Sequence, residues 1–284
     1  MTASGRVFYD GTLTRPQLDH PEGVAIHPDG SVWCGGERGQ IFRIAADGSA
    51  MDEVATTDGF ILGIAFGAEG DLYACDVRHR AVFRIDTTTG AVRRHSDGAP
   101  RRPFVAPNFP VVAPDGSLYV SDSNVAGEPG PGIYRIHPDG TTELWFSGPL
   151  NFANGLALSA EGYALLVVES FGPVITRIPI TAGGTAGRPE PVATLRGTVP
   201  DGIAVGPDGM LYVGCYEPSQ VLRVDPSTGQ VSTVLTDPTA HLLCHPANVA
   251  VRGDQLFTSN LGRWHITVID DVFDGASGQR VRQT

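Results

Sequence analysis

The sequence predicts an all-β chain, a single six-bladed β-propeller whose four-stranded antiparallel blades surround a central channel. Three observations favour this fold: short β-branched and aromatic runs, Pro-Asp-Gly turns between them, and six copies of one unit. Glycine and proline number 36 and 22 among the 284 residues, and long helical periodicity is missing. Short strands joined by tight turns of this kind are typical of all-β proteins built from hairpins.

Each of the six units reads as a strand, a turn, a second strand, a loop and a third strand. The units begin at Glu22, Leu62, Asn108, Asn154, Asp201 and Asn248, and the spacings are 40, 46, 46, 47 and 47 residues. A four-stranded propeller blade takes roughly 40–50 residues. The segment before the next unit supplies a fourth strand, and Arg6 to Tyr9 can complete the last blade. A closed ring predicts one domain over residues 1–284.

Composition and charge exclude several classes of protein. No apolar run approaches the roughly 20 residues of a membrane helix, and MTASGRVFYDG has no basic start or apolar run of a secretion signal. The net charge is −11, and Arg101-Arg102 is the one basic cluster, so we expect no nucleic-acid partner. Four widely spaced cysteines form no Cys-x-x-Cys pair, which favours reduced thiols and a cytoplasmic protein.

An arginine recurs in the third strand of five units. These residues are Arg43, Arg84, Arg135, Arg177 and Arg223. Recurrence in five blades predicts a structural role, because a long arginine stem can pack while its charged head stays hydrated.

The turns set the blades in register. The acidic residue of each Pro-Asp-Gly or Ala-Glu-Gly turn falls seven residues after the start of the unit in five blades, and six residues after it in the last. The six starting residues are therefore equivalent positions around the axis, and we name them the axial ring. Five of the six carry a side-chain oxygen, and none is Lys or Arg. Buried carboxylates and amides are unfavourable without a partner.

A hard divalent cation would satisfy these oxygens. Carboxylate and amide oxygens suit Ca²⁺, which takes 6–8 oxygen ligands, and the axial ring lacks the Cys and His residues that zinc prefers. We therefore predict one divalent metal ion, Ca²⁺ in preference to Mg²⁺, Mn²⁺ or Zn²⁺, with Glu22, Asn108, Asn154 and Asp201 as ligands. Asn-Gly and Asp-Gly are also turn signals in their own right, but their shared register across four blades favours the cation.

Three motifs resemble the senescence marker protein-30/gluconolactonase superfamily: PEGVA at Glu22, FANG at Asn154 and PDGIAV at Asp201. This superfamily of six-bladed propellers includes calcium-dependent lactonases, paraoxonases and a fluorophosphatase. The resemblance covers nearly the whole chain, and FANGLALSAEGYALLVVES and ITRIPITAGGTAGRPEPVATLRGTVPDGIAV also look like the strictosidine synthase-like branch. It implies that Glu22, Asn154 and Asp201 bind the metal and that Asn108 joins them or contacts substrate.

Two positions depart from the family pattern. Asn108 is followed by Phe109, where members of the family often carry Asp, and Leu62 stands where paraoxonase-like members carry His. The sequence therefore lacks the extra carboxylate at position 109 and the histidine at position 62 that serve as proton carriers in those members.

These features predict a metal-dependent hydrolase, a lactonase that acts on a small lactone or ester. The cation would polarise the carbonyl and stabilise the oxyanion. The predicted catalytic residues are Asp201, as nucleophile or general base, with Asn108, His245 and His265; His20 is a further histidine candidate in the loops.

The substrate is expected to contact six residues: Leu62, Phe109, Asn248, Phe171, Trp264 and Asp122. Further candidates are Phe60, Phe152 and Trp145 for the pocket walls, and Asp76 and Glu169 at the ends of second strands. Leu62 leaves one side of the axial ring without a ligand, so the apolar portion of the substrate is expected there.

Three alternatives remain open. The chain could be a condensing or ring-closing enzyme like strictosidine synthase, a phosphotriesterase, or a non-catalytic binding propeller. The complete metal set argues against the first, because the plant synthase uses no metal, and the polar axial ring argues against the last. Fold alone does not decide function.

Overall fold

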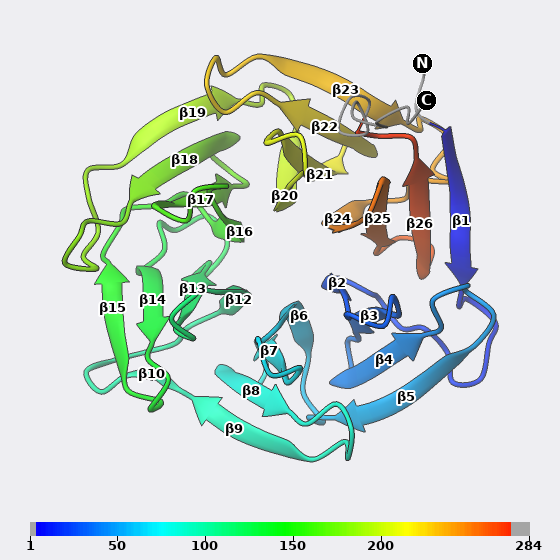
Figure 1. Ribbon diagram of the computed structural model, residues 1–284, viewed down its shortest axis with the longest axis horizontal. Coiled ribbons are helices and arrows are strands. Elements are labelled where there is room, and N and C mark those ends of the chain that lie inside the picture. The colour runs from blue at the N-terminus through cyan, green and yellow to red at the C-terminus, as the bar shows by residue number, and fades with distance from the viewer. Residues whose placement is uncertain (1–3, 274–284) are drawn as a thin grey trace, which may run out of the picture.

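The computed structural model describes residues 4–273, which form a ring of six blades (Figure 1). All regular elements in this part of the chain are strands, and it contains no helix that could span a membrane. The predicted six-bladed β-propeller is confirmed. The predicted domain of residues 1–284 includes both ends of the chain, which lie outside the described residues.

The first three blades follow the chain in order. Blade 1 contains β2 (Val24–Ile26), β3 (Val32–Gly35), β4 (Gln40–Ile44) and β5 (Met51–Thr56). Blade 2 contains β6 (Ile61–Phe66), β7 (Leu72–Asp76), β8 (Ala81–Ile85) and β9 (Val92–Ser96). A two-stranded hairpin, β10 (Gly98–Ala99) and β11 (Arg102–Pro103), leads to blade 3. Blade 3 contains β12 (Pro107–Val112), β13 (Leu118–Asp122), β14 (Gly132–Ile136) and β15 (Thr142–Phe146).

The other three blades complete the circle. Blade 4 contains β16 (Ala153–Leu158), β17 (Ala164–Glu169), β18 (Val174–Pro179) and β19 (Glu190–Thr194). Blade 5 contains β20 (Val199–Val205), β21 (Leu211–Glu217), β22 (Gln220–Val224) and β23 (Val231–Thr236). Blade 6 contains β24 (Pro246–Arg252), β25 (Gln255–Asn260), β26 (His265–Asp270) and β1 (Ser4–Asp10).

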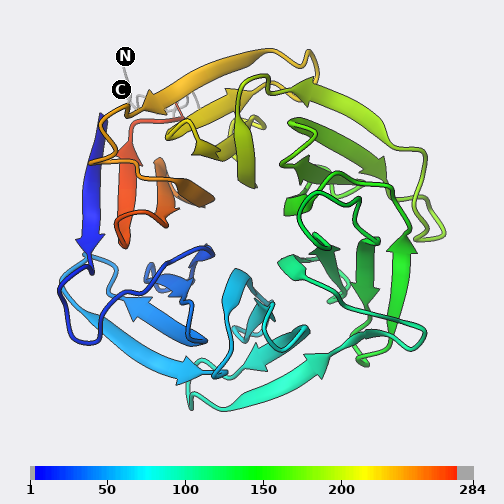
Figure 2. The same ribbon diagram turned by 180° about the vertical axis from the view of Figure 1, so that it is seen from behind.

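The last blade joins the two ends of the described chain. Strand β1 pairs antiparallel with β26, from Ser4 opposite Asp270 to Asp10 opposite His265. Seen from behind, the blue N-terminal strand lies beside the red strand of the same blade (Figure 2). The prediction that a strand around Arg6 to Tyr9 completes the last blade is confirmed, and the pairing of β1 with β26 closes the ring.

The turn between the first two strands explains the recurring Pro-Asp-Gly signature. In blade 1 the Asp29 carboxylate accepts a hydrogen bond from the Ser31 amide at 2.8 Å, and Gly30 has a φ of +85°. In blade 3 Asp115 accepts from the Ser117 amide at 2.9 Å in the same way. The Asx-type contact and a left-handed glycine together favour this tight turn.

The recurring arginines bind these turns. Arg43 pairs with Asp29 at 3.1 Å, Arg135 with Asp115 at 2.7 Å, and Arg223 with Asp208 at 3.1 Å. Arg84 pairs with Asp71, while Arg177 donates to the Pro226 carbonyl at 2.9 Å. The third strand is thereby tied to the first turn of its own blade in four cases and to the next blade in the fifth. These contacts support the structural role expected for the five arginines.

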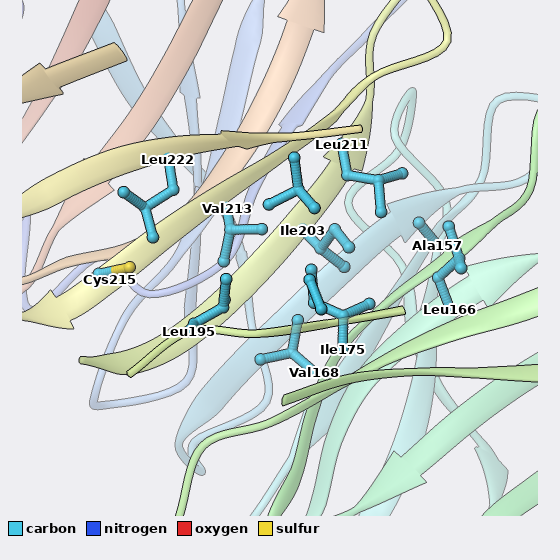
Figure 3. Packing of buried hydrophobic residues seen from close by; sticks show 12 residues of the cluster. Ala157, Leu166, Val168, Ile175, Leu195, Ile203, Leu211, Val213, Cys215 and Leu222 are labelled. Carbon is cyan, nitrogen blue, oxygen red and sulfur yellow. The ribbon is translucent and has the colours of Figure 1, made fainter. Parts of the chain in front are cut away.

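Apolar side chains fill the space between neighbouring blades. Figure 3 shows one such cluster, in which Val168 and Ile175 of blade 4 meet Ile203 and Val213 of blade 5. These four side chains are at most 3% exposed. Each blade therefore buries both faces of its sheet against its neighbours, and the rigid packing holds the inner strands in place around the axis.

Candidate metal and substrate site

The axial ring lies on the inner strands, which surround the centre of the molecule in Figure 1. Leu62, Asn108, Asn154, Asp201 and Asn248 lie near the starts of β6, β12, β16, β20 and β24, and Glu22 lies just before β2. Its polar members are almost completely buried, from 0% exposed for Asn248 to 9% for Glu22. Polar groups buried this deeply require partners.

A glycine follows four of the six axial positions and lets the inner strands approach closely. A Cβ on Gly155 would lie 2.7 Å from the Asp201 carbonyl oxygen, and one on Gly23 would lie 2.9 Å from the Ile64 nitrogen. Such distances exclude a side chain unless the backbone moves. The glycines therefore keep the axial side chains of adjacent blades near one another.

The Asn108 amide has a defined orientation. Its Nδ2 donates to Ser123 Oγ at 2.9 Å, while Ser123 Oγ donates its single hydrogen to the Ala153 carbonyl at 2.7 Å. Ser123 can therefore only accept from Asn108, which assigns the amide nitrogen to the serine side. Asn108 Oδ1 is left on the other side, buried and without a hydrogen-bond donor among the described residues.

Asn154 repeats this arrangement in the next blade. Its Nδ2 donates to Ser170 Oγ at 3.1 Å, and its Oδ1 is buried without a donor. Asp201 Oδ1 is buried without a donor too, and neither polar atom of the Asn248 side chain has a partner in residues 4–273. The axial ring thus gathers one oxygen acceptor from each of four successive blades, and none of these four oxygens has a hydrogen-bond donor within the described residues.

The two carboxyls of the axial ring lie within electrostatic reach of each other. Burial, followed by the negative charge of Asp201, raises the pKa of Glu22 well above its usual value. Burial raises the pKa of Asp201 to about 7, and the Asn154 amide opposes that shift. Both shifts show that the protein alone does not stabilise the ionised carboxylates.

These observations are what a site for a hard cation requires. Glu22 and Asp201 provide carboxylates, and Asn108 and Asn154 provide amide oxygens. Each amide nitrogen donates to a serine hydroxyl, which leaves the amide oxygen without a hydrogen-bond partner. Oxygen donors of this kind match Ca²⁺ and the other hard divalent ions. The residues present therefore fit a divalent cation, and a cation would stabilise the ionised carboxylates that burial disfavours.

Sequence reasoning missed four serines that organise the axial ring. Besides Ser123 and Ser170, Ser121 Oγ donates to the Asn154 carbonyl at 2.7 Å, and Ser259 Oγ donates to the Glu22 carbonyl. Ser121 and Ser259 each lie on the second strand of one blade and bind the axial residue of the next. A serine at or just after the end of the second strand, as in YVSDS and FTSN, is the signal that could have found them.

The acidic residues at the ends of second strands have structural contacts. Asp122 accepts hydrogen bonds from the amides of Val105 and Ala106 at 2.7 and 2.9 Å, in the loop that enters its own blade. Asp76 accepts from the Phe60 amide at 3.2 Å, and Glu169 from the Asn151 amide at 2.7 Å. This differs from the expectation that Asp122 contacts substrate, because its oxygens already bind loop amides. The same reason applies to Asp76 and Glu169.

The expected catalytic histidines lie outside the axial ring. His265 is 2% exposed, and its Nε2 lies 2.9 Å from the Leu242 carbonyl. It opens β26, the third strand of its blade, so its buried contact differs from the expected catalytic role. His245 is half-buried, with Nδ1 3.0 Å from the Tyr216 carbonyl and 3.2 Å from Glu217 Oε1. Only its other ring nitrogen is left for a substrate.

His20 belongs to a small cluster of charged groups beside the axial ring. Its Nδ1 lies 2.7 Å from Glu37 Oε2 and 3.1 Å from Asp19 Oδ1. Arg38 also pairs with Asp19 at 2.9 Å. Asp19, His20 and Glu37 are close enough to hold a metal ion together, but Asp19 also pairs with the Arg38 cation.

The expected aromatic residues divide into two groups. Phe109 and Trp145 are 8% and 9% exposed and pack in the core between blades 3 and 4, which differs from the expectation that Phe109 contacts substrate. Phe171 is 54% exposed and packs on Phe152. Trp264 is half-buried and packs on His20.

Leu62 is half-buried, so an apolar side chain occupies the blade 2 position of the axial ring. The direction of a bound substrate relative to Leu62 stays a prediction.

The loops that follow the second strands lie at the same end of the blades as the axial ring. Ala153, next to Asn154, pairs with Glu169 at the end of β17, and Pro246, close to Asn248, pairs with Asn260 at the end of β25. Antiparallel pairing places the start of one strand opposite the end of the other. We name this end of the molecule the ring face.

The fold and the axial ring together define a six-bladed β-propeller with a buried set of oxygen donors at its axis. A family model described as "SMP-30/Gluconolactonase/LRE-like region" matches residues 56–258, and one described as "Strictosidine synthase-like, N-terminal" matches residues 12–44. Because the first match covers most of the chain, the protein belongs to the SMP-30/gluconolactonase/LRE-like family.

Curated relatives match parts of the chain at low identity. Protein STRICTOSIDINE SYNTHASE-LIKE 6 of Arabidopsis thaliana is 26% identical over 54% of this chain and 46% of its own length. Gluconolactonase of Zymomonas mobilis is 28% identical over 38% of this chain and 33% of its own length. Regucalcin of Danio rerio is 27% identical over 34% of both chains. The chain thus spans about half or less of the length of these relatives.

Solved structures match over nearly the whole ring. A gluconolactonase from Xanthomonas campestris has a TM-score of 0.78 at 22% identity, covering 94% of this chain and 89% of its own. A calcium-binding protein, regucalcin, from Agrobacterium tumefaciens has a TM-score of 0.76 at 18% identity, covering 96% and 95%. At these identities the likeness shows the fold.

Proposed function

We propose that this protein is a metal-dependent lactonase that hydrolyses a small lactone or ester at the axial ring. The observation that supports this most is the set of buried, donor-free oxygens on Asn108, Asn154 and Asp201. Glu22 completes the set of four ligands, and Ca²⁺ is the preferred ion over Mg²⁺, Mn²⁺ or Zn²⁺ because all donors are hard oxygens. Relatives named gluconolactonase support the lactone as substrate.

Each residue of the site has a separate task in this proposal. When bound, the cation supplies the Lewis acid that polarises an ester carbonyl. Ser123 and Ser170 accept hydrogen bonds from the amide nitrogens of Asn108 and Asn154. These bonds fix the two amides so that their oxygens stay free for the cation. Asp201 is the carboxylate that attacks the carbonyl or takes a proton from the attacking water. We favour Asp201 over His265, whose Nε2 already contacts the Leu242 carbonyl.

A lactone and ester panel, assayed with and without chelator, tests this proposal. Asp201→Asn keeps the shape of the side chain and removes its charge and basicity, so hydrolysis should fall by about 10²–10⁴-fold. Asp254→Asn is the matched control, because Asp254 is exposed in the turn at the opposite end of blade 6. The control should keep full activity.

The panel also separates the alternatives. Full hydrolysis after chelation would remove the metal from the proposal. Turnover of a phosphotriester in preference to every lactone would favour the phosphotriesterase. Calcium binding without any hydrolysis would favour a binding propeller.

A condensing or cyclising enzyme is the second candidate. It is favoured by the strictosidine synthase-like family model over residues 12–44 and by the Arabidopsis relatives of that name. The buried carboxylate pair and the donor-free oxygens count against it, since the family implies that the plant synthase works without metal. A condensation activity that survives chelation would support this candidate.

A cytoplasmic location is part of the proposal. All four cysteines are buried and free, and reduced cysteines are usual in the cytoplasm.

A further inference from the structure

Three aromatic pairs stand on the ring face, and we name their six residues the aromatic collar. Phe152 and Phe171 have ring centroids 4.7 Å apart, Tyr216 and His245 are stacked at 4.5 Å, and His20 and Trp264 lie at 4.7 Å. Such spacings are those of favourable aromatic contacts.

The collar residues are neighbours of the axial ring along the chain. Phe152 precedes Asn154 by two residues, and Phe171 directly follows Ser170, the serine that binds the Asn154 amide. His20 likewise precedes Glu22 by two residues. Two pairs thus have a member within two residues of a proposed ligand along the chain.

The third pair adjoins the other side of the axial ring. Tyr216 follows Cys215, which pairs with Pro200 beside Asp201. His245 precedes Pro246 at the start of β24, the strand that carries Asn248. The collar therefore borders Asp201 and Asn248 as well.

The collar leaves apolar surface in water. Phe171 is 54% exposed and Tyr216 is 39% exposed. Two other exposed apolar residues, Leu13 and Val125, lie in ring-face loops as well, at 93% and 58%. Apolar surface gathered in this way next to a site marks a region that is covered when a ligand binds.

The backbone holds the collar in an uncommon conformation. His20, Phe152, His245 and Trp264 have φ values of +42°, +62°, +52° and +53°. Residues other than glycine rarely adopt positive φ, and such strain gathers at ligand sites. Four of the six collar residues share it, which supports a binding role for the collar.

Several polar side chains of the ring-face loops are already engaged, whereas the polar atoms without a partner lie in the axial ring. Asp122 and Glu169 bind loop amides, and the Nδ1 atoms of His20 and His245 contact carboxylates. A polyhydroxylated sugar lactone requires several free donors and acceptors around its hydroxyls, because each unpaired polar group is costly. An apolar substituent instead finds exposed aromatic faces.

We propose that the substrate is a lactone or ester with an aryl or long alkyl substituent, which the aromatic collar covers while the ester group lies at the axial ring. This inference rests on the lactonase proposed above. Phe171 and Tyr216 then determine substrate specificity, and polyhydroxylated lactones are expected to be poor substrates.

The test compares four lactones with the full-length protein: dihydrocoumarin, δ-decalactone, δ-valerolactone and δ-gluconolactone. Dihydrocoumarin and δ-decalactone should have kcat/KM values at least about tenfold above the other two. Phe171→Ala and Tyr216→Ala should each raise KM for these two by about tenfold. Tyr163→Ala is the matched control, since Tyr163 is 76% exposed in the turn at the opposite end of blade 4.

Calorimetry with the lactam counterpart of dihydrocoumarin measures the collar without hydrolysis. The wild type and Tyr163→Ala should bind it equally, and Phe171→Ala about tenfold more weakly. Preference for δ-gluconolactone, or unchanged lactam binding by both collar variants, would overturn the inference. If no lactone is hydrolysed, the lactonase proposal fails, and the lactam measurement still decides whether the collar binds an aryl group.

Discussion

Ser123 is not itself an expected ligand of the metal, yet its hydroxyl decides which way the Asn108 amide faces. Its hydroxyl accepts from Asn108 Nδ2 and donates to the Ala153 carbonyl of the next blade. The Ser123 hydroxyl therefore links the orientation of the Asn108 amide to the contact between blades 3 and 4. Its loss should affect the affinity for the metal more than the stability of the fold.

Ser123→Ala should weaken calcium binding by about tenfold. The Asn108 amide loses the acceptor that fixes its orientation, and the Ala153 carbonyl loses a donor. Each buried polar group that loses its partner costs about 1–3 kcal/mol. Titration calorimetry of the metal-free protein measures the affinity. Ser232→Ala, on the exposed strand β23, is the control and should bind calcium as the wild type does. An unchanged affinity in Ser123→Ala would show that the Asn108 oxygen is not a ligand.

Strands and turns show which parts of the site follow from sequence. The Pro-Asp-Gly turns set the register, and the register alone placed Asn108, Asn154 and Asp201 on inner strands and Glu22 just before one. The sequence could not distinguish Asp122 as a structural residue, because its backbone partners at Val105 and Ala106 lie 16–17 residues away. An acid at the end of a strand looks the same in sequence whether it binds an amide or a substrate.

The histidines and serines were hidden for the same reason. His265 was expected near the substrate, but its partner is the Leu242 carbonyl, 23 residues away. Ser259 acts on Glu22 across the closure of the ring. Contacts between distant segments are set by tertiary packing, which a local pattern does not contain.

The closure between blades 6 and 1 depends on Arg252, at the end of β24. Its guanidinium donates to the Gly30 and Ala46 carbonyls at 2.6 and 2.9 Å and lies 4.4 Å from the centre of the Phe257 ring. Arg252→Met should lower the free energy of unfolding by about 2–3 kcal/mol, since two charge-assisted hydrogen bonds and a cation–π contact are lost.

Urea unfolding measures this loss, with Arg93→Met on β9 as control, because Arg93 is exposed and forms no ion pair among the described residues. Equal stability of the two variants would contradict a role for Arg252 in closing the ring.

At the scale of the whole molecule, the six blades surround an axis at which two carboxyl groups are buried. Burial raises the pKa values of Glu22 in blade 1 and Asp201 in blade 5. The negative charge of Asp201 raises the pKa of Glu22 further. A bound cation would stabilise the ionised forms of these carboxyls. Because a ligand that binds only the folded state raises its stability, the cation should stabilise the folded protein.

The pH dependence of that stabilisation follows from the sign of the shifts. Both carboxyls bind protons more tightly in the folded protein than in the unfolded chain, so the stability they contribute is complete below the unfolded pKa of about 4. The contribution of Asp201 is lost as the pH rises through about 7, and that of Glu22 is lost as the pH rises through its own raised pKa. In the proposed site calcium would bind the ionised form. The rise in Tm on adding Ca²⁺ should therefore be larger at pH 8 than at pH 5.5, because protons compete at the lower pH.

Scanning calorimetry of metal-free and calcium-loaded protein measures both quantities. Asp201→Asn removes one of the two carboxyls, so in this variant the pH dependence of the metal-free Tm should flatten and most of the calcium effect should disappear. Asp254→Asn should behave as the wild type. A calcium effect of the same size at both pH values in the wild type would mean that the cation binds away from Glu22 and Asp201, and the axial ring would then lose its role as the metal site.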